Sequence, residues 1–440
     1  MGLGAFISKL LGAIYRVPLT NILGSLGLGL YQTVFPVYCL LLDFSGAGVP
    51  GALSKLIATG EEKEREFRAE KYLKSSLKLL IAFGTIGTLI MALLSSPISS
   101  LQGNVQAKNA YIALAPAVLL VCLISCFRGY FQGFMDMKPT AFSQIIEQVI
   151  KLSFGLLFVK IFSYSVEKAV AGATFAISLS ESVALIYLAI IYKKRKNTLP
   201  VNKTYDEKSF SDYVKDIIKT TIPLTVIGIA IPFSQVIDSF ITINIIKAYN
   251  SNATALYGLF SGAVMTVINL PVSICYGLSA VAIPAVSSAK TSEEKESKAK
   301  KTLVLTVLAS LPCVVFCMVF APFIINLLFG SLSIQDKEIA IKLLRLTAPC
   351  ILLLSIVQTS NAVLVGKGKT YFPVISLSVG ILVKTFLSII LLKNPKLNIY
   401  GSSIALIACY FIVCLVNLTL MIKLKVKNAN TRAYNRQYAS

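Results

Sequence analysis

Four polar side chains share one face of an otherwise apolar stretch, residues 140–162. Gln144, Glu147, Gln148 and Lys151 are spaced i, i+3, i+4 and i+7, which places them on one side of an α-helix. Lipid leaves charged and amide groups without hydrogen-bond partners, so this stripe must face protein or water. The four side chains suit the binding of a polar or charged ligand. The alternative is a structural ion pair between Glu147 and Lys151, four residues apart.

Other ionisable residues also lie deep inside apolar stretches. Asp238 belongs to a second stripe with the same spacing, formed with Gln235, Ser239 and Thr242. A lone charge at the centre of a bilayer costs about 2.5–3.5 kcal/mol even on the insertion scale, so these groups must be paired or line a cavity. Two interpretations of Glu181 stay open, a structural pair with a neighbouring helix and a functional role. The candidate ligand-binding residues are therefore Arg16, Asp43, Gln144, Glu147, Gln148, Lys151, Gln235, Asp238 and Lys384.

Composition indicates the elements that must position these residues. The 440-residue chain is 55% hydrophobic and only 14% charged, against about 25% charged for soluble domains. Runs such as 77–94 and 303–328 are too long and too apolar for soluble core helices. We therefore predict an all-α integral membrane protein. The predicted spans are 1–18, 29–57, 75–95, 108–132, 140–162, 168–192, 217–246, 254–286, 302–330, 339–366, 370–392 and 400–424.

The chain contains an internal repeat. Ala115-Pro116, Gly133 and Lys151 recur as Ala348-Pro349, Gly366 and Lys384, each 233 residues later. Six spans per half is an even number, so both halves enter the membrane in the same orientation, around a central polar cavity. The predicted parts are an N-terminal six-helix half (1–195), a cytoplasmic linker (196–216), a C-terminal six-helix half (217–424) and a disordered cytoplasmic tail (425–440). We also expect the second span to break at 43–51, where Gly and Pro cluster.

The formal net charge of +22 follows from topology, not from nucleic-acid binding. Lys and Arg gather in alternate predicted loops, which identifies those loops and both termini as cytoplasmic. A further attraction for anionic lipids is expected. The nine cysteines all fall in apolar runs and are predicted to be reduced, while the absence of histidine removes His metal ligands and His bases. We find no enzyme motif, and expect no enzyme activity, metal or cofactor.

Several segments resemble the stage V sporulation protein B type of polysaccharide flippase, within the multidrug/oligosaccharidyl-lipid/polysaccharide (MOP) exporter superfamily. The similar segments are GAIYRVPLTNILGSLGLGLYQTVFPVY (12–38), GVPGALSKL (48–56), FRGYFQG (127–133), the M-x-PTA-x-SQIIEQ pattern (137–148), QVIDSF (235–240), ATALYGLFSG (253–262) and NLPVSICYGLSAVAIPAVS (269–287). The resemblance runs from residue 1 to about 425. It implies movement of an undecaprenyl-pyrophosphate-linked sugar, as in peptidoglycan or spore-wall synthesis, from the inner to the outer leaflet of a bacterial plasma membrane.

The resemblance extends only in part to the site residues of the related lipid II flippases. The first-helix Arg of those proteins falls on Lys9, and their second essential Arg falls one position from Arg16. Their charged cluster before the eighth-span proline has no counterpart, because MetThrValIleAsn occupies 265–269. The resemblance therefore does not identify the substrate, although it still implies a flippase. A coupling ion and cell-wall synthesis enzymes are further partners that the resemblance allows.

Two other functions remain open. A cation-coupled drug exporter of the same superfamily would need an acidic cavity for organic cations, and bases outnumber acids within the predicted spans. A non-transporting scaffold for cell-wall enzymes would have a filled interface in place of a basic cavity between the halves. The excess of bases within the predicted spans favours an anionic substrate, since Arg and Lys bind phosphate groups by charge-assisted hydrogen bonds.

The distribution of Lys and Arg makes a testable prediction about topology. Single cysteines introduced at Glu64, Lys196 and Lys298 should be cytoplasmic, because all three positions lie in the basic loops. Intact cells should protect them from a membrane-impermeant thiol reagent, and permeabilised cells should not. Labelling of any of the three in intact cells would reverse the assignment.

Overall fold

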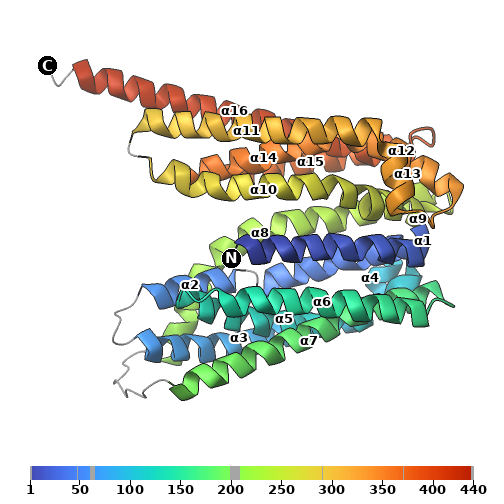
Figure 1. The fold of residues 1–440 in the computed structure, drawn as a ribbon, viewed down its shortest axis with the longest axis horizontal. Helices are drawn as coiled ribbons and strands as arrows, with labels where there is room; N and C mark the ends of the chain where they lie inside the picture. The colour runs from blue at the N-terminus through green and yellow to red at the C-terminus, as the bar shows by residue number, and fades with distance from the viewer. Residues whose placement is uncertain are drawn as a thin grey trace. The chain divides into compact units, whose positions relative to one another are not determined.

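The computed structural model describes the backbone of residues 2–46, 48–59, 65–198, 209–289, 291–369 and 371–437, and the side chains of these residues except 2–10, 13, 45, 197–198, 223–224, 226–227, 276, 278, 280, 292 and 424–437. This part of the chain is built from helices and their connections (Figure 1). The first helices are α1 (Gly2–Ser45), α2 (Val49–Ala58), α3 (Arg65–Leu93), α4 (Ser95–Leu101), η1 (Val105–Ala107), α5 (Lys108–Gly133), α6 (Lys138–Ile161), α7 (Val166–Thr198), α8 (Phe210–Lys247) and α9 (Ala253–Tyr257). They are followed by the π-helical η2 (Gly258–Val264), α10 (Met265–Ser287), α11 (Ser292–Val319), α12 (Ala321–Leu328), α13 (Ile334–Thr347), α14 (Pro349–Gly366), α15 (Phe372–Leu392) and α16 (Tyr400–Gln437).

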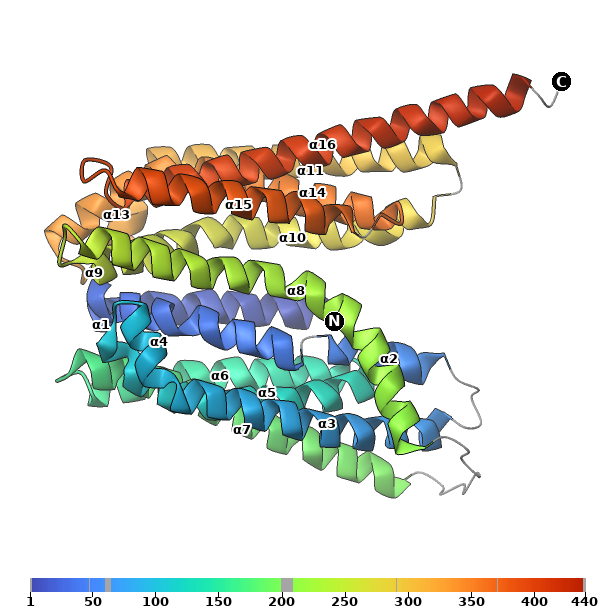
Figure 2. The ribbon, with the colours of Figure 1, turned by 180° about the vertical axis from the view of Figure 1, so that it is seen from behind.

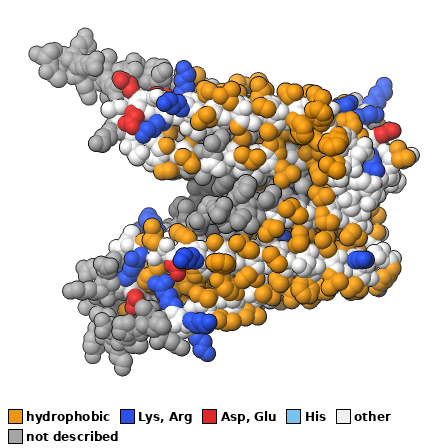
Figure 3. Space-filling model, viewed as in Figure 1, with side chains coloured by type: hydrophobic (Ala, Val, Ile, Leu, Met, Phe, Trp, Pro, Cys, Tyr) orange, Lys and Arg blue, Asp and Glu red, His pale blue; other side chains and the backbone are white. Residues whose placement is uncertain are grey.

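Eleven of the described segments are long and apolar enough to cross a membrane. The sequence predicted twelve spans, and the difference arises at the start of the chain, where one run, Ile14–Ala58, takes in residues of the first two predictions. The space-filling view agrees with a membrane location, because apolar side chains cover the middle of each unit's visible face, and Lys and Arg lie towards its ends (Figure 3). The chain is therefore an all-helical membrane protein.

Helix α1 is interrupted at Gly24. This residue has φ +67° and ψ −175°, a backbone conformation that is essentially confined to glycine. Figures 1 and 2 show the chain turning back at this end of α1, so that the segments on either side of Gly24 run alongside each other. The predicted break at 43–51 is confirmed, since α1 ends at Ser45 and α2 begins at Val49 with Pro50 in its first turn. Residue 47 lies outside the described residues.

The described chain forms two compact units. Unit 1 comprises residues 1–247 and 252–258, and unit 2 comprises residues 248–251 and 259–440. In unit 1, α3 packs on α5, while α5 and α6 both pack on α7, and α8 contacts α1 and α3. The sequence placed α8 at the start of the second repeat, whereas the contacts group α8 and α9 with unit 1. Residues 199–208 of the predicted linker lie outside the described residues, and its two ends belong to α7 and α8.

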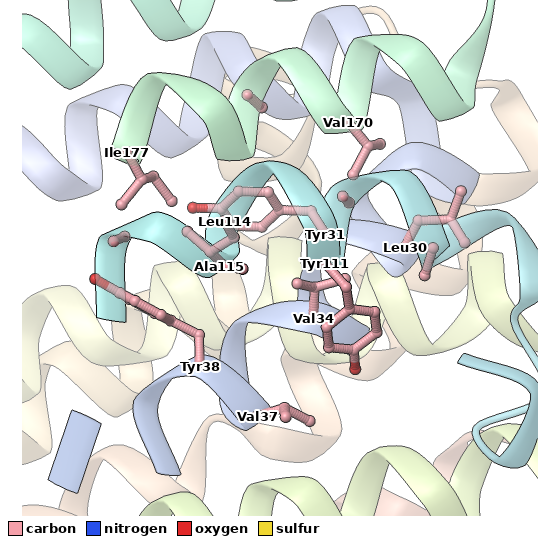
Figure 4. Packing of buried hydrophobic residues seen from close by; sticks show 14 of the residues in the cluster. Leu30, Tyr31, Val34, Val37, Tyr38, Tyr111, Leu114, Ala115, Val170 and Ile177 are labelled. Atoms are coloured by element: carbon pink, nitrogen blue, oxygen red, sulfur yellow. The ribbon is translucent and has the colours of Figure 1, made fainter. Parts of the chain in front are cut away.

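The core of unit 1 is centred on α1, α5 and α7. Tyr31, Val34 and Tyr38 of α1 are buried against Tyr111 and Leu114 of α5, together with apolar residues of α7 (Figure 4). Residues three and four apart on α1 supply these contacts, as expected for one helix face buried in protein. This packing holds α1 beside the helices that carry the polar stripe.

In unit 2, hydrogen bonds between short polar side chains join neighbouring helices. Thr359 of α14 shares hydrogen bonds with Ser279 of α10 (3.1 Å) and Thr306 of α11 (2.8 Å). Asn417 of α16 donates to Ser360 Oγ of α14 at 2.9 Å. Small hydroxyl and amide groups commonly join membrane helices in this way, because they allow close backbone approach and satisfy one another.

The helix bounds of unit 2 follow those of unit 1 at the predicted offset. Helix α5 ends at Gly133 and α14 at Gly366, while α6 begins at Lys138 and α15 at Phe372. The stretch predicted as one span over 339–366 is two helices, α13 and α14, that meet at Ala348 before Pro349. The 302–330 span is likewise divided, into α11 and α12 at Phe320. At the C-terminus the disordered tail was wrong over 425–437, because α16 continues to Gln437 through a segment without Gly or Pro.

One end of unit 1 is tied by buried hydrogen bonds. Asn104 donates to Thr33 Oγ1 of α1 at 3.0 Å and accepts from Thr254 of α9. Gln102 donates to Ser239 Oγ of α8 at 3.1 Å and accepts from Tyr111 of α5. The network joins the connection between α4 and α5 to four helices. It is fully buried, so each lost partner would leave an unsatisfied polar group.

The same end contains a backbone contact that only glycine allows. A Cβ atom on Gly29 of α1 would lie 2.0 Å from the carbonyl oxygen of Thr254, and one on Gly258 would lie 2.3 Å from that of Ser25. Because the obstructing atoms belong to the backbone, a side chain there would have to displace α9 from α1.

We predict that Gly29→Ala destabilises the protein by at least about 1–3 kcal/mol, because overpacking forces the backbone to shift. The measurement is thermal unfolding of the purified protein in detergent. Gly277→Ala in α10 is the matched control, since a Cβ there meets nothing within 4 Å. A Gly29→Ala protein that unfolds at the parent temperature would show that the close approach is absent.

Candidate functional site

The polar stripe of α6 is anchored by an ion pair to α5. Arg128 Nη2 lies 3.0 Å from Glu147 Oε2, and Arg128 Nε donates to Ser143 Oγ at 3.1 Å. The side chains of Arg128 and Glu147 are only 16% and 17% exposed. Ser143 in turn donates to the carbonyl of Thr140, which fixes its orientation. The arginine thus has partners at two positions along α6, and its partners supply both charge and hydrogen bonds.

A second carboxyl group completes the cluster from α7. Glu181 is 4% exposed and lies within electrostatic range of Glu147. Arg128 and Lys151 are also within electrostatic range of Glu181. Its Oε2 atom is buried without a hydrogen-bond partner. Three helices therefore bring two acids and two bases together inside segments that span the membrane.

Lys151 lies on the side of the cluster that faces α1. Its Nζ atom is 5.9 Å from the ring centroid of Tyr15, within cation–π range. Arg16, the next residue along α1, interacts electrostatically with both Tyr15 and Lys151, and Cys39 lies within range of the same two bases. Lys151 and Arg16 thus concentrate positive charge where α1 and α6 pack.

The two glutamines of the stripe have different environments. Gln148 donates to Glu147 Oε1 at 3.4 Å, and its own Oε1 is buried without a partner. A Cβ on Gly12 of α1 would lie 3.4 Å from that oxygen, so the amide reaches the surface of α1. Gln144 is partly exposed. The stripe is therefore continuous with the contact between α1 and α6.

The remaining candidates lie apart from this cluster. Asp43 is partly exposed and approaches α8, with its carboxyl carbon 3.8 Å from the Cβ position of Gly228. On α8 itself Gln235 is exposed and Asp238 partly exposed. Lys384 is 7% exposed in α15 of unit 2, so it is not among the residues that unit 1 brings together. The side chain of Lys9 lies outside the described residues.

The alternative that the sequence left open, a structural ion pair of Glu147 with Lys151, is replaced in the structure by a pair with Arg128. Among the described residues the partner of Glu147 is Arg128, which approaches from another helix. Arg128 was missing from the candidates, although it lies in the FRGYFQG segment at 127–133. An arginine inside an apolar span opposite a predicted intramembrane acid was the signal that could have identified it. Glu181 of α7 lies within electrostatic range of Glu147 and Lys151 of α6.

The described residues include no group of three or more His, Cys, Asp or Glu side chains that could hold a metal ion. Within the cluster the adjacent Arg128 and Lys151 would repel a cation, and they favour anions. The chemistry of the cluster is therefore charge recognition.

We predict that Arg128→Met destabilises the protein by about 3–5 kcal/mol, because it leaves Glu147 buried without its cation. Thermal unfolding in detergent measures this loss. The double variant Arg128→Met/Glu147→Gln should recover most of it, since the uncompensated charge is then removed.

Lys298→Met is the control for loss of a positive charge. Its pair with Glu294 is more exposed, and such pairs contribute about 0–1 kcal/mol. Equal effects of Arg128→Met and Lys298→Met would contradict a structural role for the buried pair.

Comparison with known proteins agrees with this architecture. The family model "Polysaccharide biosynthesis protein" matches residues 1–290, and the MatE model matches residues 223–390. The chain is 28% identical over 437 residues to stage V sporulation protein B of Bacillus subtilis (strain 168), covering 96% of this chain and 83% of the relative. It is 26% identical over 413 residues to the lipid II flippase MurJ of the same organism, covering 89% of this chain and 76% of the relative.

Solved structures share the fold. An inward-facing MATE multidrug transporter of the MOP superfamily superposes with a TM-score of 0.79 at 17% identity, covering 96% of both chains. The lipid II flippase MurJ in an inward closed conformation superposes with a TM-score of 0.73 at 15% identity, covering 95% of this chain and 86% of that chain. The chain thus belongs to the polysaccharide biosynthesis protein family.

Proposed function

We propose that this protein is a flippase that moves an undecaprenyl-pyrophosphate-linked saccharide from the inner to the outer leaflet of a bacterial plasma membrane. The observation that carries the proposal is the positive charge of Lys151 and Arg16 inside membrane spans, in a chain related to a lipid II flippase. A pyrophosphate group carries about two negative charges and is costly to desolvate, so its path must supply cations.

The two halves would act by alternating access. The helix bounds that recur at the predicted offset support two six-helix repeats in the same orientation, with α1 crossing the membrane on each side of Gly24 and both termini in the cytoplasm. In this arrangement Lys384 is the counterpart of Lys151, and Asp43, Gln235 and Asp238 contribute from the helices around the transport path. Alternating exposure of such a path is the general mechanism of transporters built from repeats.

A cation-coupled multidrug exporter is the second candidate. The MatE match over residues 223–390 and the likeness to MATE structures favour it. The charges of the cluster argue against it, because organic cations would meet Lys151 and Arg16. A non-transporting scaffold for cell-wall enzymes would need no buried bases beside its helices at all. The three functions differ in whether a lipid pyrophosphate or an organic cation crosses the membrane.

We predict that Arg16→Ala abolishes transport, and that Arg16→Lys restores it only in part, because lysine lacks the bidentate guanidinium. Lys151→Ala and Lys384→Ala should each weaken binding of the lipid pyrophosphate, and parent binding should fall with rising salt. The measurement is translocation of a labelled undecaprenyl-pyrophosphate saccharide by purified protein in vesicles.

Lys337→Ala on α13 serves as the matched control, since this exposed lysine lies outside the cluster. Normal turnover by folded Arg16→Ala would refute the site. Transport of an organic cation without transport of the lipid would favour the drug-exporter function over the flippase. Transport of neither would favour the scaffold function.

A further inference from the structure

We propose that a pocket between α5, α6 and α7 of unit 1 binds an anionic phospholipid, with one acyl chain inside the pocket and the phosphate at Lys168. None of the residues that line this pocket belongs to the charged cluster around Glu147. The proposal therefore goes beyond the transport function and does not depend on it.

The size and walls of the pocket suit a hydrocarbon chain. Its volume is about 420 Å³, within the range of about 300–1,000 Å³ that is usual for ligand sites. Phe158 and Phe162 of α6 and Phe175 of α7 line it, and the ring centroids of Phe158 and Phe175 are 5.8 Å apart. Small residues, Ala113 of α5 and Gly172 of α7, leave the space between these rings and helices open.

The three helices around the pocket are held together by direct contacts. A Cβ atom on Gly172 would lie 3.0 Å from Cβ of Phe158 and 3.2 Å from Cδ2 of Phe162, so α6 packs closely on the backbone of α7. Ser178 of α7 donates a hydrogen bond to the carbonyl of Ala113 on α5 at 2.8 Å. The pocket is therefore a feature of packed helices and not of a loop.

The polar residues of the pocket lie at helix ends. Asn109 is the second residue of α5 and Lys168 the third residue of α7, and both side chains are exposed. Lys168 Nζ donates to the hydroxyl of Tyr164 at 3.4 Å and lies 5.1 Å from the centroid of that ring. Within the part of the chain that the structure describes, Lys168 thus contacts a neutral tyrosine in place of a carboxylate. Its positive charge is available to a phosphate, which lysine binds by charge-assisted hydrogen bonds.

The order of polar and apolar groups along α7 matches that of a phospholipid. Phe175 follows Lys168 by seven residues, which places it about 10 Å deeper at 1.5 Å per residue. A lipid whose phosphate contacts Lys168 would place the first part of an acyl chain between the aromatic rings. An anionic lipid fits better than a zwitterionic one, because the ammonium group of a zwitterionic lipid would bring a second positive charge to Lys168.

The absence of tryptophan from the chain allows a direct test, because a single introduced tryptophan reports on one position. The full-length Phe175→Trp protein is reconstituted in phosphatidylcholine vesicles, and quenching of its fluorescence by lipids with brominated acyl chains is measured. Brominated phosphatidylglycerol should bind about fivefold better than brominated phosphatidylcholine, which corresponds to roughly 1 kcal/mol, the attraction of one lysine near an anionic surface. Phe83→Trp on α3, an exposed position outside the pocket, should show no preference.

Further changes, each combined with Phe175→Trp, test the two parts of the pocket. Lys168→Gln should abolish the preference for phosphatidylglycerol. Lys160→Gln should retain it, because Lys160 is an exposed lysine at the same end of α6 that does not line the pocket. Ala113→Leu should fill the pocket and reduce quenching by both lipids.

Three results would overturn the proposal. Equal quenching of the Phe175→Trp protein by the two lipids would show an ordinary lipid boundary. The same preference in the Phe83→Trp protein, or its survival in Lys168→Gln, would show attraction to the charge of the whole protein. If Ala113→Leu fails to fold, the comparison of Lys168→Gln with Lys160→Gln decides alone, since both changes are made on exposed side chains.

Discussion

The ion pair between Arg128 and Glu147 is the interaction on which the candidate site depends. It links two adjacent helices within apolar segments, and both side chains are largely buried. Because Arg128 also contacts Ser143, the pair sets the rotation of α6 about its axis, and with it the direction in which Gln148 and Lys151 point. Lys151 is thereby held against α1, beside Tyr15 and Arg16. This face is basic because Glu147 is paired with Arg128, while Lys151 lies beside Arg16.

Two kinds of polar contact stabilise unit 1, and they serve different purposes. The uncharged network around Gln102 and Asn104 closes one end of the unit, where α1, α5, α8 and α9 meet. Neutral partners of this kind fix geometry and are insensitive to pH. The charged cluster lies on α5, α6 and α7, and we propose that it recognises anions. A transporter needs both properties, because a site that changes its charge can act on its surroundings only through helices that keep their packing.

Much of the fold could be predicted from the sequence, because hydropathy and helical spacing are local properties. The break before α2 and the bases of α1 and α6 follow from Gly, Pro and charge positions alone. The partner of Glu147 could not be found locally, because the i, i+4 rule describes an isolated helix and Arg128 approaches from another helix. The sequence identified Glu181 as an intramembrane acid but could not place it near Glu147, because their proximity depends on how α6 packs on α7. The continuation of α16 was missed because a polar composition was read as disorder where nothing interrupts a helix.

The short connection between α5 and α6 has a consequence for how the protein enters the membrane. Only residues 134–137 separate the two helices, so Arg128 and Glu147 leave the ribosome within moments of each other. Either helix alone would carry an unpaired charge into the bilayer, at about 2.5–3.5 kcal/mol on the insertion scale. As a hairpin, the two helices present a neutral, hydrogen-bonded pair to the lipid. We therefore expect α5 and α6 to insert into the membrane together, followed by α7, which carries Glu181.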